Sequence, residues 1–268
     1  MNEIERDFET GQLIQSAAEI YEQFFVPALF QNWPKHIIKL TPITAESSVL
    51  DVACGTGVLA REAAKISNHV TGVDLNSEML GVARSTDATI RWEQGNAELL
   101  PFEDNSFDFV VSQFGLMFFD DKVKAIREMY RVLKPGGQMT VAVWVCIEDA
   151  IGYAAMKSLA IRLFGEELSP SFDAPFVLGD PDLLLSLFND AGVPAPTIQT
   201  LDGNARYPSI EDWVYNDIKG WTLAGALDDD QFDLLLQRSK QEFQHLVQAD
   251  GTVEFSSPAH IVSANKST

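Results

Sequence analysis

VLDVACGTG, residues 49–57, decides the fold of this chain. Its apolar lead-in predicts a buried strand, Gly55 and Gly57 predict a tight turn, and the residues from Val58 onward predict a helix. A strand that enters a helix through a glycine turn brings bare backbone close to a ligand. The stretch therefore predicts a ligand-binding loop at the edge of a sheet.

Strand and helix patterns alternate around this loop. Apolar runs that are typical of strands recur after it, and amphipathic segments that are typical of helices separate them. Alternation at this spacing predicts an α/β fold with a doubly wound, mostly parallel sheet and helices on both faces. The expected strands are 49–53, 69–74, 89–93, 107–112 and 138–145, and the expected helices are 59–66, 76–84 and 122–133.

The composition is ordinary for a globular protein except for its acidity. Of the 268 residues, 46% are hydrophobic and 22% charged, and 19 basic against 39 acidic residues give a net charge of −20. Phosphate backbones and anionic membrane surfaces repel such a chain. We therefore expect neither nucleic acid nor membrane as a partner, and we interpret the acidity as a solubility device or an adaptation to salt.

Three features favour a cytoplasmic location. No apolar run reaches the roughly 18 residues that a membrane-spanning helix needs. The first residues, Met1–Asp7, are too acidic for a signal or transit peptide. The two cysteines, Cys54 and Cys146, lie in strand contexts typical of small buried thiols, as in a reducing compartment.

The glycine loop fits two kinds of ligand. Gly55-x-Gly57-x-x-Ala60 matches the dinucleotide fingerprint, which favours an NAD(P)-dependent oxidoreductase. Asp51, however, would repel a diphosphate and suits a ligand with ammonium or sulfonium charge. Asp74 ends the next strand, where an acid can bind a ribose diol. The structural alternatives are a helix N-cap for Asp74 and a turn acid for Asp51.

Four motifs in this region resemble those of the class I S-adenosylmethionine-dependent methyltransferases. The resemblance is to the small-molecule enzymes similar to the ubiquinone and menaquinone C-methyltransferases. The motifs are DVACGTG at 51–57, VDLN at 73–76 with Met79-Leu80, GNAELLPF at 95–102 with DNSFD at 104–108, and EMYRVLKPGG at 128–137. Ala53 replaces the first loop glycine of the family, and Asn96 replaces an Asp but keeps a carbonyl acceptor.

The resemblance implies a seven-stranded sheet and four segments with separate roles. We expect a helical N-terminal lid at 1–44 and a cofactor-binding, Rossmann-like core at 45–146. We expect a cap that binds the acceptor at 147–209. Residues 210–268 are expected to form C-terminal helices and a last strand that completes the core sheet. The cap contains apolar residues among prolines and glycines, which suit a flat or hydrophobic acceptor: Phe164, Phe172, Phe176, Leu178 and Phe188. It suits a packing layer or a homodimer surface equally well.

The resemblance also implies a binding site for S-adenosyl-L-methionine. Asp74 would bind the ribose, and Asn96 with the Ala97 amide would bind adenine. Tyr21 would cover the carboxylate or sulfonium end, the latter by cation–π contact, although it also reads as an ordinary helix-face aromatic. The expected cofactor residues are Tyr21, Asp51, Ala53, Cys54, Gly55, Gly57, Asp74, Leu75, Met79, Asn96, Ala97, Glu98, Ser112 and Gln113.

The implied reaction is methyl transfer to oxygen, nitrogen or carbon of a small molecule by in-line displacement. Such an enzyme aligns the acceptor, excludes water and in some cases removes a proton. No catalytic base is assigned; Gln113 and His36 are the candidates, and a solvated helix position is the favoured interpretation of His36. No metal site is expected, because the histidines are isolated. The alternatives are the oxidoreductase above and a non-catalytic S-adenosylmethionine-binding protein.

Overall fold

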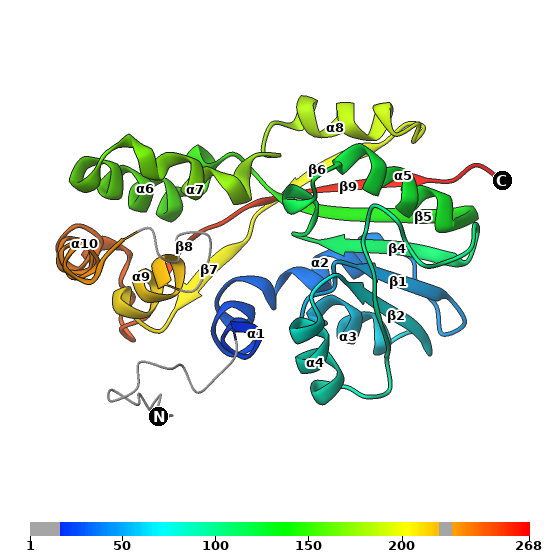
Figure 1. Cartoon of the computed structure of the whole chain (residues 1–268), viewed down its shortest axis with the longest axis horizontal. Coiled ribbons are helices and arrows are strands. Elements are labelled where there is room, and N and C mark those ends of the chain that lie inside the picture. The colour runs from blue at the N-terminus through cyan, green and yellow to red at the C-terminus, as the bar shows by residue number, and fades with distance from the viewer. Residues whose placement is uncertain (1–16, 220–226) are drawn as a thin grey trace.

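The computed structural model describes residues 17–219 and 227–268 and is built on one large sheet (Figure 1). Its seven strands run in the order β3-β2-β1-β4-β5-β9-β6. This confirms the expected doubly wound, mostly parallel α/β fold. The strands are β1 (Ser48–Val52), β2 (His69–Asp74), β3 (Arg91–Gln94), β4 (Phe107–Gln113), β5 (Leu133–Trp144), β6 (Thr197–Leu201) and β9 (Ala259–Asn265).

The order of the strands places the end of β1 at the centre of the binding edge. The strands β1 to β5 are all parallel, and β9 is antiparallel to both β5 and β6. The chain runs outward from β1 to β2 and then crosses to β4 on the other side. Open α/β sheets bind ligands where the strand order reverses in this way. The loop after β1 lies at this point.

Helices cover the parallel strands in the expected alternation. Helix α3 (Val58–Ala64) packs on β1 and β2, α4 (Ser77–Thr86) on β2 and β3, and α5 (Lys122–Val132) on β4 and β5. Val49, Leu50 and Val52 of β1 are completely buried, as expected for a central parallel strand covered on both faces. The sheet and these helices are called the core below.

A second lobe lies beside the core, on the left in Figure 1. Helix α10 packs on α6 and α9, and α6 packs on β8 of a separate two-stranded sheet. Rings fill the interior of this lobe: Trp213 lies 4.5 Å from Phe255, and Tyr207 lies 6.1 Å from Phe255 between ring centroids. The lobe contains α6 (Ile151–Phe164), α7 (Ser169–Asp173), β7 (Asn204–Tyr207), α9 (Ile210–Lys219), α10 (Asp229–Glu242) and β8 (Val253–Ser256).

The two lobes do not follow the segment boundaries expected at 147–209 and 210–268. Helix α8 (Pro181–Asp190) packs on α5, and β6 is the edge strand of the large sheet, so part of the expected cap belongs to the core. Conversely, α9 and α10 of the last segment belong to the second lobe. The last segment holds two strands, β8 and β9, and not the single last strand that was expected, because Pro258 between them has no N–H for a ladder.

The N-terminal helical segment, described from residue 17 onward, lies across the binding edge. It consists of α1 (Ala17–Ile20), the π-helix η1 (Tyr21–Phe30) and α2 (Trp33–Leu40); residues 1–16 of the expected lid lie outside the described residues. The Gln31 N–H donates to the Val26 carbonyl over the wide π-type spacing, at 2.8 Å. Pro27 lies inside η1, where it would interrupt a regular α-helix. Among the described residues, no helix has the length and apolar character needed to cross a bilayer.

Candidate functional site

The β1–α3 loop owes its shape to residues with left-handed backbone. Ala53, Gly55 and Gly57 have φ values of 55°, 54° and 90°. A Cβ at residue 57 would lie 2.3 Å from the Trp92 ring, so only glycine fits there. The Gly57 N–H donates to the Cys54 carbonyl at 2.8 Å and closes the turn. The loop therefore presents its backbone at the end of β1.

Asp51 is the unusual group of this site. Its side chain is buried, and neither carboxylate oxygen has a hydrogen-bond partner among the described residues. Burial raises the pKa of Asp51 to about 8. An isolated buried carboxylate is costly unless a positive charge or a proton accompanies it. Asp51 therefore carries a proton in the free protein, and its carboxylate form suits a cationic group.

Asp74 ties the loop to the neighbouring strand. Its Oδ2 accepts from the Gly55 N–H and its Oδ1 from the Asn76 N–H, both at 2.8 Å. The N-cap of α4 is Asn76, whose side chain accepts from the amides of Glu78 and Met79. Asp74 is therefore not the cap, and its carboxylate retains lone pairs for two hydroxyl donors. Burial raises the pKa of Asp74.

The lid covers the loop through one ring and one ion pair. Tyr21 Cε1 lies 3.9 Å from the position that a Cβ on Gly55 would take. Burial, together with nearby carboxylates, raises the pKa of the Tyr21 phenol. Glu22 pairs with Arg61 of α3 at 2.7 Å, and Arg61 also donates to the Thr56 carbonyl. The lid is thus attached to the first turns after the loop.

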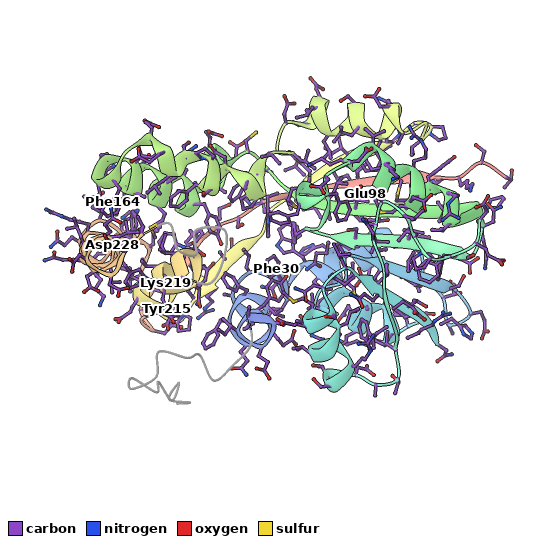
Figure 2. The ribbon with its side chains drawn as sticks, viewed as in Figure 1. Phe30, Glu98, Phe164, Tyr215, Lys219 and Asp228 are labelled. Atoms are coloured by element: carbon purple, nitrogen blue, oxygen red, sulfur yellow. The ribbon has the colours of Figure 1, made fainter. Side chains whose placement is uncertain are left out.

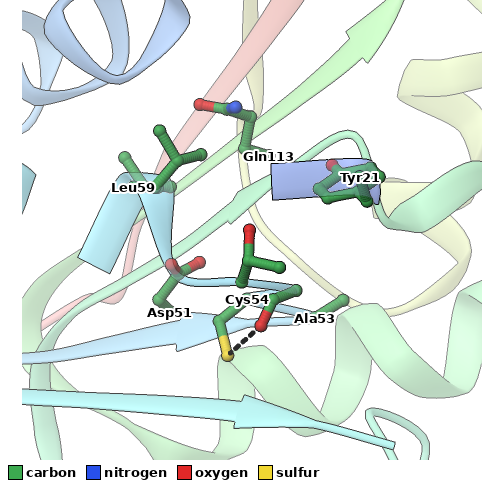
Figure 3. Close-up of a pocket in the computed structure, with 9 residues that line it drawn as sticks. Tyr21, Asp51, Ala53, Cys54, Leu59 and Gln113 are labelled. Atoms are coloured by element: carbon green, nitrogen blue, oxygen red, sulfur yellow. Dashed lines mark hydrogen bonds between the residues drawn. The ribbon is translucent and has the colours of Figure 1, made fainter. Parts of the chain in front are cut away.

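A pocket brings together six of the residues expected from the sequence (Figure 3). Sequence reasoning missed three further lining residues. Thr56 lies inside the motif, but the loop was predicted from the glycines on either side of it. Val58 and Leu59 were assigned only to the helix that follows the loop. The side-chain oxygens of Thr56 and Gln113 Oε1 are buried and have no partner among the described residues. The lining residues are Tyr21, Asp51, Ala53, Cys54, Gly55, Thr56, Val58, Leu59 and Gln113.

The residues expected around ribose and adenine lie along the adjacent edge, outside this pocket. The Gly95 N–H donates to the Asp74 carbonyl at 3.0 Å, which brings the ends of β2 and β3 together. Asn96 Oδ1 accepts from the Glu98 N–H at 2.8 Å and keeps a second lone pair. Leu75 is 66% exposed, Met79 is half-buried and Ala97 is buried. Gly57 lies against Trp92 behind the loop.

The structure does not bring Ser112 or His36 into the pocket. Ser112 Oγ donates to the Val52 carbonyl at 2.8 Å and is completely buried. Side chains alternate along a strand, so Gln113 points the other way and reaches the pocket. Its Nε2 donates to the Phe30 carbonyl of the lid at 3.3 Å. His36 is exposed on α2, with its ring 5.5 Å from Trp33.

Comparison with known proteins places the chain in a family. Residues 50–141 match the model described as a methyltransferase domain. A demethylmenaquinone methyltransferase of Staphylococcus epidermidis is 34% identical over 201 residues, which cover 72% of this chain and 79% of that protein. The chain belongs to the class I S-adenosylmethionine-dependent methyltransferases. This confirms the resemblance drawn from the motifs.

Other relatives of this methyltransferase match a shorter stretch. A demethylmenaquinone methyltransferase of Listeria monocytogenes serotype 4a is 44% identical over 119 residues, or 41% of this chain and half of that protein. Among solved structures, a methyltransferase of Bacillus halodurans has a TM-score of 0.62 at 21% identity, covering 88% of this chain and 99% of that one. At this identity the likeness shows the fold alone.

The residues of the pocket fit the cofactor of this family, S-adenosylmethionine. A solved structure of similar fold, a phosphoethanolamine N-methyltransferase of Haemonchus contortus, contains S-adenosylhomocysteine; its TM-score is 0.61 at 21% identity, covering 97% of this chain and 58% of that one. The unpaired carboxylate of Asp51 suits the positive charge of the cofactor, which carries no phosphate. Within 17–219 and 227–268, no three His, Cys, Asp or Glu side chains gather in a way that could hold a metal ion.

Proposed function

We propose that this chain transfers the methyl group of S-adenosylmethionine to oxygen, nitrogen or carbon of a small-molecule acceptor by in-line displacement. When bound, the cofactor supplies a methyl group on a positively charged sulfur. The observation that carries the proposal is the buried, unpartnered carboxylate of Asp51 at the end of β1. Such a group favours a cationic ligand and disfavours the diphosphate of NAD.

The other residues divide the work of binding. Asp74 would accept hydrogen bonds from the ribose hydroxyls, and Asn96 with the Ala97 amide would bind adenine. The lid residue Tyr21 would exclude water from the methionine end. Gln113 would orient groups in the pocket through its unpaired Oε1. Alignment and water exclusion account for much of the rate in such transfers, so no general base is assigned.

The acceptor that we propose first is a hydroxylated aromatic of the quinol type. Support comes from the relatives named demethylmenaquinone methyltransferase, one of which aligns with 72% of this chain. A ring acceptor also suits the aromatic side chains between the core and the second lobe, such as Phe30 (Figure 2). Carbon or oxygen of that ring would then receive the methyl group.

Calorimetry tests the cofactor assignment. We expect S-adenosylmethionine and S-adenosylhomocysteine to bind and NAD to give no heat. The Asp74→Ala variant should lose most of the affinity, whereas Asp190→Ala, at an exposed position at the end of α8, should retain it. Tight binding of NAD without a response to S-adenosylmethionine would contradict the proposal.

A transfer assay with a labelled methyl donor tests the activity. The panel would contain hydroquinones, phenols, amines and fatty acids, and we expect label to be transferred to the hydroquinones or phenols. A protein that binds the cofactor but labels no class in the panel would favour the non-catalytic alternative.

A further inference from the structure

The segment between β3 and β4, residues 95–106, contains no helix and only one isolated bridge, from Asn96 to Leu99. Its first part is a tight turn at 96–99, in which the Leu99 N–H donates to the Asn96 carbonyl at 3.0 Å. A Cβ on Gly95 would lie 2.9 Å from Pro101 Cδ, so the segment folds back on its own start. The polar groups of this backbone must therefore find partners outside regular secondary structure.

Helix α5 supplies such partners through the side chains of Glu128 and Arg131. Glu128 Oε2 accepts from the Leu100 N–H at 2.9 Å. The Arg131 guanidinium donates to the carbonyls of Leu100, at 3.2 Å, and Phe102, at 2.9 Å. Both backbone polar groups of Leu100, the residue after the turn, are thus bound by α5.

Glu128 and Arg131 also bind each other, which fixes the geometry of both side chains. Arg131 Nε and Nη2 donate to the two oxygens of Glu128 at 2.7 and 2.8 Å, and Nη1 donates to Asp104 at 2.7 Å. The side chains of Glu128 and Arg131 are only 15% and 29% exposed, and the guanidinium lowers the pKa of Glu128. A planar guanidinium can form this fork, whereas a lysine ammonium cannot.

Two further contacts join the segment to the ends of α5. Near its start, Glu98 Oε1 accepts from the Asp121 N–H at 2.9 Å (Glu98 is labelled in Figure 2). Near its end, the Asn105 N–H donates to the Arg131 carbonyl at 3.1 Å. The segment is therefore attached to α5 on both sides of the Glu128–Arg131 contacts, and α5 sets the position of the turn at 96–99.

We propose that Glu128 and Arg131 are positioning residues for adenine recognition. They hold the turn at the place where the Asn96 side chain binds the adenine amino group and the Ala97 N–H binds a ring nitrogen. The proposal rests on the cofactor assignment proposed above. Asn96 Oδ1 accepts from the Glu98 N–H, which orients the second lone pair of this oxygen. Because hydrogen bonds span only about 2.7–3.2 Å, a shift of the turn by about 1 Å loses both contacts to the base.

Two ligands that differ only in the base test the proposal. We would measure by calorimetry the binding of S-adenosylhomocysteine and of S-inosylhomocysteine, whose base has an oxo group in place of the amino group and a proton on the adjacent ring nitrogen. This base can make neither contact with the turn, and each hydrogen bond contributes about two- to tenfold in affinity. We therefore expect the wild type to prefer S-adenosylhomocysteine by about tenfold or more.

The variant Arg131→Lys keeps the positive charge but loses the fork. It should lower the preference to less than about threefold, through weaker binding of S-adenosylhomocysteine alone. The variant Glu128→Gln should also lower the preference, because an amide has only one acceptor oxygen for Leu100 and Arg131. It provides the test if Arg131→Lys fails to fold.

A matched control is Arg127→Lys, because Arg127 lies on the same helix and donates to the Asp190 carbonyl at 3.2 Å. This variant should keep the preference of the wild type. A merely structural role would weaken both ligands by the same factor, so an unchanged preference in Arg131→Lys and Glu128→Gln overturns the proposal, as does equal binding of the two ligands by the wild type. A wild type that shows the preference but transfers no label in the assay above contradicts the methyl transfer and supports the adenine contacts.

Discussion

Ala53 occupies a backbone conformation that suits glycine better. Its φ of 55° lies in the left-handed region, which costs a residue with a Cβ about 1–2 kcal/mol. We expect Ala53→Gly to raise the free energy of unfolding by about 1 kcal/mol, since part of the gain is lost to the entropy of the unfolded chain. Urea denaturation measures the change.

Gly115 provides the control for this strain. A Cβ on Gly115 would lie 2.6 Å from the Ala53 Cβ, which is too close. Glycine at position 53 has no Cβ, so the Ala53→Gly variant would avoid this clash. Gly115→Ala should therefore destabilise the wild type more than it destabilises the Ala53→Gly variant. A double-mutant cycle reports this coupling. If Gly115→Ala lowers the free energy of unfolding equally in the wild type and in Ala53→Gly, the side chains at positions 53 and 115 do not clash.

Asp51 should make cofactor binding depend on pH. Its pKa of about 8 means that the free protein holds a proton on this carboxyl at pH 6 to 7. A cationic ligand favours the carboxylate, so affinity for S-adenosylmethionine should rise from pH 6 to 8 and level off above. Calorimetry on the wild type and Asp51→Asn separates this from titration of the ligand amine, which occurs near pH 8. The same pH slope in both proteins would refute the assignment.

Sequence reasoning found the residues of the site that belong to a local motif. Asp51 and Gly55 follow from the strand–turn–helix pattern, and Asp74 from the end of the next strand. The contact of Gln113 Nε2 with the Phe30 carbonyl carries no local signal, because the two residues meet only after the lid packs against the end of β4. His36 had the right chemistry for a base, but α2 places it on an exposed face.

One ion pair helps to attach the lid to helix α3. Glu22 of η1 and Arg61 of α3 are each about one-fifth exposed. Partly exposed pairs contribute modestly, so Glu22→Gln should speed dissociation of S-adenosylmethionine two- to fivefold without unfolding the protein. Stopped-flow displacement by S-adenosylhomocysteine measures this rate.

Glu62 offers the control for the lid. It lies on the same helix as Arg61 but pairs with Lys65 of that helix and not with a lid residue. Glu62→Gln should leave the dissociation rate unchanged. If both variants release the cofactor equally fast, the effect comes from the loss of one negative charge and not from the ion pair between Glu22 and Arg61.

The elements that sequence reasoning placed well are those with a strong period. The buried strands and the amphipathic helix at 122–133 were found because tertiary packing agrees with their local pattern. The strand β7, of four residues, was missed because it is too short to show a period. The π-helical form of η1 has no separate sequence signature beyond Pro27.

The second lobe contains a buried acid that should make the stability of the molecule depend on pH. Asp217 accepts from Trp213 Nε1 at 2.7 Å and from the Tyr207 hydroxyl at 3.2 Å, and Tyr207 contacts Tyr153 at 2.8 Å. Burial raises its pKa to about 7. The folded state then holds this proton more tightly than the unfolded chain, so the free energy of unfolding falls as pH rises from about 4 to 7.

Asp217→Asn tests this linkage. The variant leaves one donor unpaired and should be less stable overall, but its free energy of unfolding should fall less between pH 5 and pH 8 than that of the wild type. Asp51 and Asp74 titrate in the same direction and maintain a residual slope. Urea denaturation at several pH values gives the comparison, with the exposed Asp190→Asn as control. Parallel curves for wild type and Asp217→Asn would mean that Asp217 does not titrate.

At the scale of the whole molecule, the sequence predicts the sheet better than the division into lobes. The alternating pattern identifies strands but does not say on which side of the sheet a later helix packs. Helices α8 and α10 have similar capped starts, yet α8 packs on the core and α10 on the second lobe. Long-range pairing with β9 decides where β6 belongs.

The central place of β9 has a consequence for synthesis of the chain. Residues 259–265 lie between β5 and β6, both of which leave the ribosome earlier. Until β9 emerges, both of those strands present unpaired edges, which readily recruit other chains. Closure of the sheet is therefore a late event in biogenesis, and a nascent chain that stalls before residue 259 is the form most exposed to aggregation and most in need of a chaperone.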